Sequence, residues 1–147
     1  MKTQLHRGRL IDHIQLVVRD LKASQDFYAA VLAVLEIPIT ATAEGYFWAD
    51  ELVVSSAESP AAQGMLTGRH HLALQAKDRA AVDAFYRVAL AHGGRSNGEP
   101  GERPYHPGYY ATFVIDPDGN NIEAVYHGEA QRSVPSVVIE LDRKSAC

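Results

Sequence analysis

The chain contains an internal repeat with an offset of 58 residues. Between residues 13–33 and 71–91, eight of 21 aligned positions are identical without a gap. Ordinary residue usage would give about one or two matches over this length. The matched residues of the first copy are His13, Leu16, Asp20, Ala23, Phe27, Tyr28, Leu32 and Ala33. A repeat of this kind predicts two copies of one structural module within a single chain.

Composition limits the class of protein. The 147 residues make one typical domain, which the repeat divides into two half-domains. An apolar content of 46% and a charged content of 22%, without a long apolar run, predict a soluble chain that does not cross a membrane. The polar start, Met1–Arg9, lacks a signal-type apolar stretch, so we expect a cytoplasmic protein. The net charge of −4 disfavours nucleic-acid binding, and the lone Cys147 leaves no disulfide within the chain.

The first module has the pattern of a β-α-β-β-β unit. The branched apolar segment Leu10–Val18 predicts a strand, and Asp20 stands where a helix N-cap is expected. Apolar residues spaced by three and four predict a helix over Leu21–Leu35, which Ile37-Pro38 ends. Three short strands are predicted after it, at Ile37–Ala41, Tyr46–Ala49 and Leu52–Ser56.

The same pattern restarts after Ser59–Gly68, which is rich in small residues, Pro and Gly and reads as a linker. A strand is predicted at His70–Ala76, an N-cap at Asp78 and a helix at Asp83–Ala91. The helix ends at His92-Gly93-Gly94, whose glycines allow a left-handed C-cap.

The segment Arg95–Gly108 holds three Gly and three Pro, so we expect a long loop that forms a lid or one wall of a pocket. Two further strands are predicted at Tyr109–Ile115 and Asn121–His127. Between them, Asp116–Asn120 supplies the residues of a hairpin turn. These strands complete the second module.

We therefore predict a single α+β domain over residues 1–147. Module one covers about 10–58, the linker about 59–68, module two about 69–128 and a C-terminal extension 129–147. The extension contains Val137–Leu141, which either adds an edge strand or docks on a partner subunit.

Two histidines occupy equivalent places on the first strand of each module. If these strands lie side by side, His13 and His71 face one concave surface, because alternate residues of a strand share a face. Glu123, on the last strand of module two, is the candidate third ligand. Two imidazoles and one carboxylate leave coordination positions open, which is typical of a catalytic metal. The neighbouring His70 is expected to point to the opposite face of its strand.

Three segments resemble the vicinal oxygen chelate superfamily, which includes glyoxalase I, extradiol dioxygenases, fosfomycin-resistance enzymes and bleomycin-binding proteins. They are DHIQLVVRDLKASQDFY, HHLALQAKDRAAVDAFY and YYATFVIDPDGNNIEAVYH, and the DPDGNN turn before Ile122-Glu123 is the most characteristic. The resemblance covers residues 10–128. It implies two tandem β-α-β-β-β modules that form a U-shaped, partly open mixed barrel around a divalent metal, with His13, His71 and Glu123 as ligands. It also implies a homodimer, in which each cleft is built within one chain or from swapped modules.

The chain also departs from this family. Glyoxalase I takes a fourth ligand from the last strand of module one, but Leu52–Ser55 offers none, and Glu51 lies just outside that strand. A three-ligand site is therefore favoured, as in dioxygenases and fosfomycin-type transferases. Phe113 stands ten residues before Glu123, where a fosfomycin enzyme is expected to have a substrate-binding tyrosine, so that specific activity is disfavoured.

These observations predict an enzyme that chelates a small substrate through vicinal oxygens on a divalent ion of Fe, Mn, Ni, Zn or Co. Lyase, dioxygenase and transferase chemistry stay open, and no general acid or base is identified. Arg103 and Arg132 are secondary candidates for binding an anionic group. The alternative is a metal-free protein of the bleomycin-resistance type that sequesters a small molecule or antibiotic. Candidates for the substrate pocket are Trp48, Tyr105, His106, Tyr109, Tyr110 and Phe113.

Overall fold

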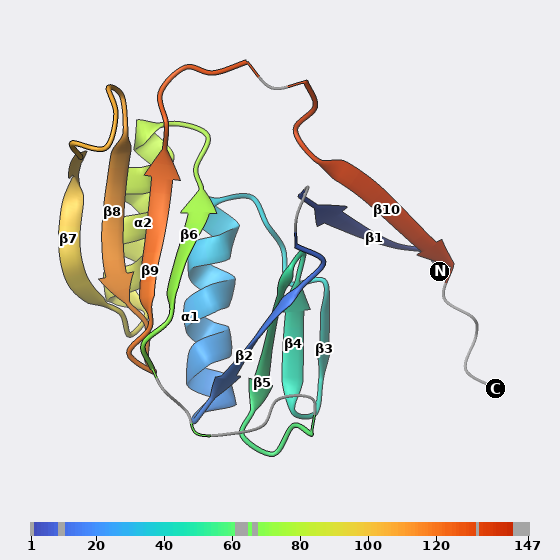
Figure 1. Cartoon of the computed structure of the whole chain (residues 1–147). Coiled ribbons are helices and arrows are strands. Elements are labelled where there is room, and N and C mark those ends of the chain that lie inside the picture. The colour runs from blue at the N-terminus through green and yellow to red at the C-terminus, as the bar shows by residue number, and fades with distance from the viewer. Residues whose placement is uncertain (1, 9–10, 61–64, 66–67, 132, 143–147) are drawn as a thin grey trace.

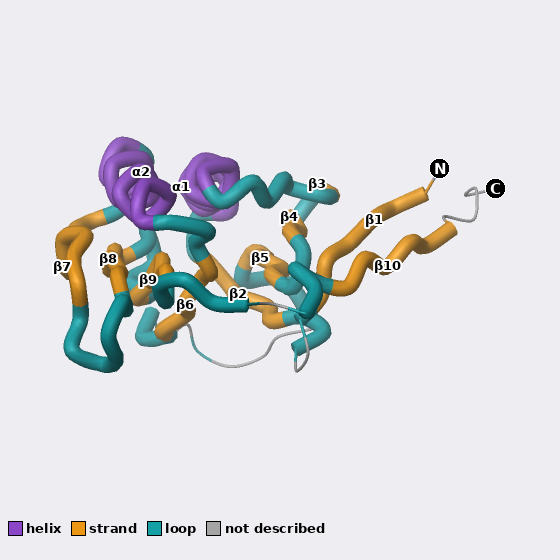
Figure 2. The backbone as a smooth tube through the Cα atoms, turned by 90° about the horizontal axis from the view of Figure 1, so that it is seen from above, coloured by secondary structure: helices purple, strands orange, loops and turns teal. Residues whose placement is uncertain are grey.

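The computed structural model describes residues 2–8, 11–60, 65, 68–131 and 133–142. Two helices lie side by side and form one layer, and two four-stranded sheets lie beneath them (Figure 1, Figure 2). Each sheet belongs to one module, and no hydrogen bonds between described strands join the two sheets, so they do not close into a barrel. The predicted α+β class with tandem β-α-β-β-β modules is confirmed.

The first module consists of one helix and a sheet with the strand order β2-β5-β4-β3, in which β2 is parallel to β5. Asp20 caps the helix as predicted, because its carboxylate accepts a hydrogen bond of 3.0 Å from the backbone N–H of Ala23. The elements are β2 (Ile14–Val18), α1 (Leu21–Val34), β3 (Ala41–Ala43), β4 (Tyr46–Ala49) and β5 (Leu52–Ser56).

Two of the predicted strands in this module are displaced. The first begins at Ile14 rather than Leu10, where its N–H meets the carbonyl of Glu51. The strand expected at Ile37–Ala41 instead occupies Ala41–Ala43, because Ile37 is still bonded to the last turn of α1 through its N–H. The chain needs the intervening residues to return from the helix to the sheet.

The second module repeats this plan with the strand order β6-β9-β8-β7 and a parallel β6–β9 pair. Its helix begins four residues earlier than predicted, directly after Asp78, whose carboxylate accepts from the N–H of Ala81 at 2.7 Å. The elements are β6 (His71–Gln75), α2 (Arg79–Ala91), β7 (Arg95–Glu102), β8 (Tyr110–Ile115) and β9 (Asn121–Tyr126).

The segment Arg95–Gly108 was expected to be a loop, and for its first half this expectation is wrong. β7 is an edge strand whose pairing with β8 shifts register twice, around Gly98 and before Gly101. Such irregularities accommodate extra residues. Pro100 is tolerated because an edge strand leaves one side of its backbone unpaired.

The two modules share one hydrophobic core. Its fully buried aromatic side chains come from both helices and from β4, and aliphatic residues of β2, β5, β8 and β9 pack around them. The OH of Tyr28, on α1, donates to the carboxylate of Asp116 in the second module at 2.6 Å. The modules are therefore tied together by apolar burial and by a buried hydrogen bond.

A separate two-stranded ribbon joins the two ends of the chain. β1 (Lys2–Arg7) pairs antiparallel with β10 (Val137–Asp142) and stands beside the first module (Figure 1). β10 thus adds to neither main sheet. Most of the predicted linker, with Arg132 and Cys147, lies outside the described residues. Within the described part of the chain, no helix is long and apolar enough to cross a membrane.

Candidate functional site

His71 and Glu123 lie together on the face of the second sheet that points away from the helices. The β6–β9 register places His71 opposite Asn121, and Ala73 opposite Glu123. Alternating neighbours such as Ile122 are fully buried in the core, so Glu123 points to the other side. We call this side the open face of the second sheet. It carries His71, Ala73, Phe113 and Glu123.

The contact between the His71 and Glu123 side chains is stabilised by a positive charge between their facing atoms. The Nδ1 atom of His71 lies 3.0 Å from the carbonyl oxygen of Asn121, and since a carbonyl only accepts, Nδ1 carries the proton. Nε2 then faces an oxygen of the Glu123 carboxylate at 3.2 Å, and both atoms offer lone pairs. A proton on Nε2 or a metal ion bound by both atoms satisfies this arrangement.

Tyr109 holds the other oxygen of Glu123, to which its OH donates a short hydrogen bond. Burial, followed by this hydrogen bond, raises the pKa of Tyr109 to about 12, so the phenol is protonated and donates at neutral pH. The Glu123 side chain is only 4% exposed. Its carboxylate is therefore fixed in orientation, as second contacts fix metal-ligating carboxylates.

The Asp116–Asn120 turn sets the position of His71. The side-chain oxygen of Asn120 accepts from the N–H of His70 at 3.2 Å, and the N–H of Asn121 donates to the carbonyl of His70 at 2.8 Å. These bonds fasten the start of β6 to the start of β9. His70 contributes its backbone here, and its side chain is not part of the His71–Glu123 contact.

His13 does not join the pair within one chain. It directly precedes β2, which runs opposite to β6, so the two strands begin at opposite ends of their sheets (Figure 1). Its Nδ1 lies 2.6 Å from the carboxylate of Asp12, and the ring is more than half exposed. This leaves Nε2 free to bind a metal in the tautomer that a carboxylate partner selects. Among the described residues, no group of three His, Cys, Asp or Glu side chains is close enough to hold an ion.

Two of the six predicted pocket residues, Tyr109 and Phe113, contact the His71–Glu123 pair, and two more pack against Tyr109. The Phe113 ring lies 6.1 Å from the His71 ring, with the Arg103 guanidinium 5.3 Å from its centre. Tyr105 packs edge-on against Tyr109, and His106 does the same from another side.

The other two predicted pocket residues lie elsewhere. Trp48 belongs to β4 of the first sheet, where its indole N–H donates to the carbonyl of Asp50. Tyr110 faces α2 and donates to Asp83, with the Arg79 guanidinium over its ring. Tyr109 and Tyr110 are consecutive, so strand alternation sends only one of them to the open face. Glu51 accepts from the N–H of Gly8 and takes no part in the site.

One residue of this neighbourhood was missed from the sequence. His127 follows β9 and lies against both His106 and Tyr109. The signal was present, because residues 123, 125 and 127 share one side of an extended chain.

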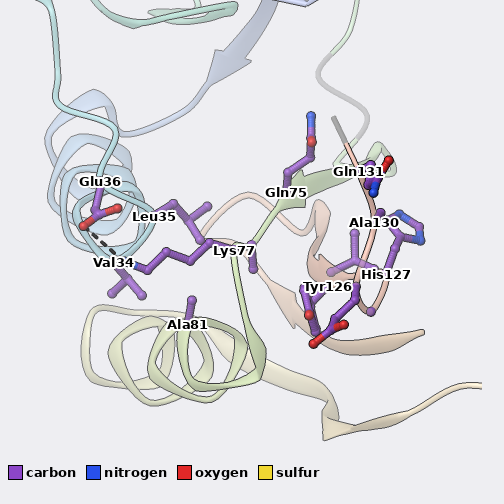
Figure 3. Close-up of a pocket in the computed structure, with 14 residues that line it drawn as sticks. Val34, Leu35, Glu36, Gln75, Lys77, Ala81, Tyr126, His127, Ala130 and Gln131 are labelled. Carbon is purple, nitrogen blue, oxygen red and sulfur yellow. Dashed lines mark ion pairs between the residues drawn. The ribbon is translucent and has the colours of Figure 1, made fainter. Parts of the chain in front are cut away.

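A pocket of about 1080 Å³ lies between the modules (Figure 3), and neither His71 nor Glu123 lines it. It is bounded by the end of α1, the start of α2 and the ends of β6 and β9, with the ion pair of Lys77 and Glu36 spanning 3.2 Å at one side. None of the six predicted pocket residues lines it.

The comparisons with known proteins agree with this architecture. A model of the Glyoxalase/Bleomycin resistance protein/Dioxygenase superfamily matches residues 10–124, and the chain belongs to that superfamily. No match was found among curated proteins.

Solved structures with the same fold include a glyoxalase/bleomycin resistance protein from Albidiferax ferrireducens T118. It is 29% identical with a TM-score of 0.63, over 80% of this chain and 98% of that one. A glyoxalase-related enzyme from Fulvimarina pelagi is 19% identical with a TM-score of 0.63, over 80% and 88% of the two chains. A glyoxalase/bleomycin resistance protein/dioxygenase family enzyme from Burkholderia phytofirmans PsJN is 18% identical with a TM-score of 0.58, over 78% and 95%. The last two support the fold alone.

Proposed function

We propose that this protein is a divalent-metal-dependent enzyme that acts on a small substrate chelated through two adjacent oxygens. His71 and Glu123 of one chain hold the ion together with His13 of a second copy, so that the working unit is a homodimer. When bound, the ion supplies Lewis-acid stabilisation of an enolate, catecholate or oxyanion, which leaves lyase, dioxygenase and transferase chemistry open.

The observation that carries this proposal is the contact of His71 Nε2 with the Glu123 carboxylate at 3.2 Å. Bonds of about 2.0–2.2 Å from one ion to each of these atoms are compatible with that separation. Each donor also has the outer contact that metal ligands need, a carbonyl for His71 and the Tyr109 hydroxyl for Glu123.

Two features support the contribution of His13 from a second copy. His13 precedes Gln15 and Val17 on the side of β2 that points away from the helices, since Leu16 and Val18 are in the core. Both sheets lie on the same side of the helix layer (Figure 2). A second chain facing this side brings its own His13 toward the His71–Glu123 pair, and its ring is already oriented by Asp12.

Mixing variants tests both the metal and the shared site. The His13→Ala and Glu123→Gln variants should each lose at least about a hundredfold in metal affinity. After the two variants are unfolded and refolded together, about half of the dimers should be mixed. Each mixed dimer has one intact site, with His13 from the second variant, so metal binding should return at up to about a quarter of the original stoichiometry.

A matched mixture serves as the control. His71→Ala and Glu123→Gln place both defects in the same half of the site, so their mixture should not recover. Recovery of metal binding in this control mixture rules out the shared site. So does a lack of recovery in the mixture of His13→Ala with Glu123→Gln. Unchanged metal binding in all the single variants rules out the metal ligands themselves.

A metal-free binding protein is the second candidate. It is favoured by one observation, that the described residues of a single chain bring together no three potential ligands. If purified protein holds fewer than about one ion per ten chains and gains none on reconstitution, sequestration of a small molecule is the better assignment.

A further inference from the structure

A pair of histidines beside the open face of the second sheet has no place in the proposed function. His106 lies between β7 and β8, and His127 directly follows β9. The Nε2 atom of His106 is 2.9 Å from the Nδ1 atom of His127, and the two rings stack with their centres 5.1 Å apart. Both side chains are exposed to solvent. Two imidazole nitrogens thus converge at an accessible point.

The backbone holds this pair in place. Gly108 and Gly128 have φ angles of 86° and 87°, a region that favours glycine, and a Cβ on Gly108 would lie 3.5 Å from the Cα of Gly128. The two loops therefore pass in close contact, two residues beyond His106 and one beyond His127. The Tyr109 ring packs edge-on against both imidazoles at 5.3 and 5.0 Å between centres. The histidines are preorganised by a rigid crossing of two segments.

The tautomer of His106 suits metal binding. Its Nδ1 lies 2.8 Å from the carbonyl of Pro107, which only accepts, so the proton is on Nδ1 and the lone pair is on Nε2. A ring N–H bonded to a backbone carbonyl is one of the outer contacts that metal-ligating histidines make. His127 places its Nδ1 against this lone pair by donating a proton, and a shift of that proton to Nε2 frees Nδ1 as a second ligand.

The separation of the two nitrogens also selects the kind of metal. With metal–nitrogen bonds of about 2.0–2.1 Å, nitrogens 2.9 Å apart subtend an angle of about 90° at the metal. That is the angle between neighbouring ligands in square-planar or octahedral geometry, which Cu²⁺ and Ni²⁺ prefer, and it is smaller than the tetrahedral angle of zinc sites.

We propose that His106 and His127 form a second metal site, which takes a divalent ion of square-planar or octahedral preference such as Ni²⁺ or Cu²⁺. Two protein ligands leave the remaining positions to water or to an oxygen of a bound molecule. The site lies across the Tyr109 ring from Glu123, so it shares no ligand with the His71–Glu123 pair.

Ni²⁺ binding to tag-free protein tests this site by equilibrium dialysis and calorimetry. His106→Gln and His127→Asn place a polar amide near the position of His106 Nε2 and His127 Nδ1, respectively. Each variant should bind one Ni²⁺ fewer per chain, or bind that Ni²⁺ at least tenfold more weakly. The matched control is His92→Gln. His92 is exposed and also has Nδ1 bonded to a carbonyl, that of Val88 at 2.9 Å, but among the described residues its ring has no contact with a second imidazole. This variant should bind as the original protein does.

The electron paramagnetic resonance spectrum of bound Cu²⁺ gives a second readout. In a His71→Ala, Glu123→Gln background, where the proposed first site is absent, the spectrum should show coupling to two imidazole nitrogens, and His106→Gln should remove it. Ni²⁺ and Cu²⁺ binding that is unaffected by both histidine variants overturns the second site. A loss of metal affinity in His92→Gln as large as in His106→Gln and His127→Asn also overturns it. Loss of binding only in the Glu123→Gln protein supports the first site alone, and loss only in the histidine variants supports the second alone.

Discussion

The two modules follow one plan but differ in the strand that pairs with the first strand of each module, β2 or β6. In module two, Ala73 of β6 lies opposite Glu123 of β9. The repeat aligns Ala73 with Gln15, and Gln15 of β2 lies opposite Val53 of β5. Module one therefore has valine where module two has the carboxylate. Each module thus has an equivalent histidine, but only module two has the acid. A site that needs His13, His71 and Glu123 must therefore combine residues of both modules.

The last hairpin of each module also serves a different purpose. In module two, Asp116 accepts from the N–H groups of Asp118 and Asn120 and from the OH of Tyr28, and the turn fastens the strand of His71. In module one, the short turn at Asp50 and Glu51 accepts instead from the backbone of the N-terminal segment. One hairpin organises the core and the site, and the other holds the terminal ribbon.

The same substitution in both turns should therefore have very different effects. Asp116→Asn replaces one buried acceptor oxygen by a donor facing donors, and should lower the free energy of unfolding by about 2 kcal/mol or more. Asp50→Asn keeps an acceptor at an exposed contact, and asparagine tolerates its φ of 45°, so the loss should stay below about 0.5 kcal/mol. Urea unfolding of both variants measures this. Equal losses would mean that the two turns do not differ in this way.

The sequence predicted those features that local patterns encode. The repeat predicted the modules, and both aspartate caps were confirmed at Asp20 and Asp78, because a cap is decided within one helical turn. Of the three candidate ligands, His71 and Glu123 lie in contact within one chain, whereas His13, which was expected to face the same surface as His71, does not join them. The edge strand β7 was missed, because its register shifts depend on a neighbouring strand rather than on its own Gly and Pro content.

The arrangement of the modules, and the contacts it decides, lay beyond such patterns. Whether His13 meets His71 within one chain depends on how the two modules pack, which is a property of the shared core. The contact of His106 with His127 likewise depends on two loops that cross at glycines 20 residues apart in sequence. Contacts between residues so far apart in the sequence produce no periodic pattern of residues from which they could be predicted.

The equivalent tyrosines of the two helices provide the next test. Tyr28 is fully buried and donates to Asp116, whereas the OH of Tyr86 donates to the exposed Ser96 at 3.0 Å. Tyr28→Phe should cost about 1–2 kcal/mol of unfolding free energy, and Tyr86→Phe less than about 0.5 kcal/mol. Chemical denaturation of the two variants gives the comparison, and a larger loss for Tyr86→Phe would contradict the difference in burial.

Tyr28 also makes the stability depend on alkaline pH. Burial, followed by the negative charge of Asp116 and the hydrogen bond to it, raises the pKa of Tyr28 well above the usual value of about 10. The unfolded chain then loses this proton before the folded one does. The contribution of Tyr28 is present below about pH 10 and is lost as the pH rises beyond it. Tyr28→Phe should flatten this decline only in part, because the pKa values of Tyr109 and Tyr110 are also raised. An unchanged slope in the variant would place the dependence elsewhere.

The smallest expected effects come from the ends of the two helices, which adopt similar left-handed turns with different residues. After α2 the turn residue is Gly93, with φ 92°, and after α1 it is Glu36, with φ 62°. A side chain in this region costs about 1 kcal/mol, so Gly93→Ala should destabilise the fold by about that amount and Glu36→Gly should stabilise it by up to as much. The gain is offset by loss of the exposed Lys77–Glu36 ion pair, which is worth about 0–1 kcal/mol. Lys77→Ala removes that pair without changing the backbone and so isolates its share. Both Glu36→Gly and Lys77→Ala lose the ion pair, so any difference between them reports the backbone at residue 36. If thermal unfolding shows Glu36→Gly to be less stable than Lys77→Ala, the left-handed conformation of Glu36 does not cost stability.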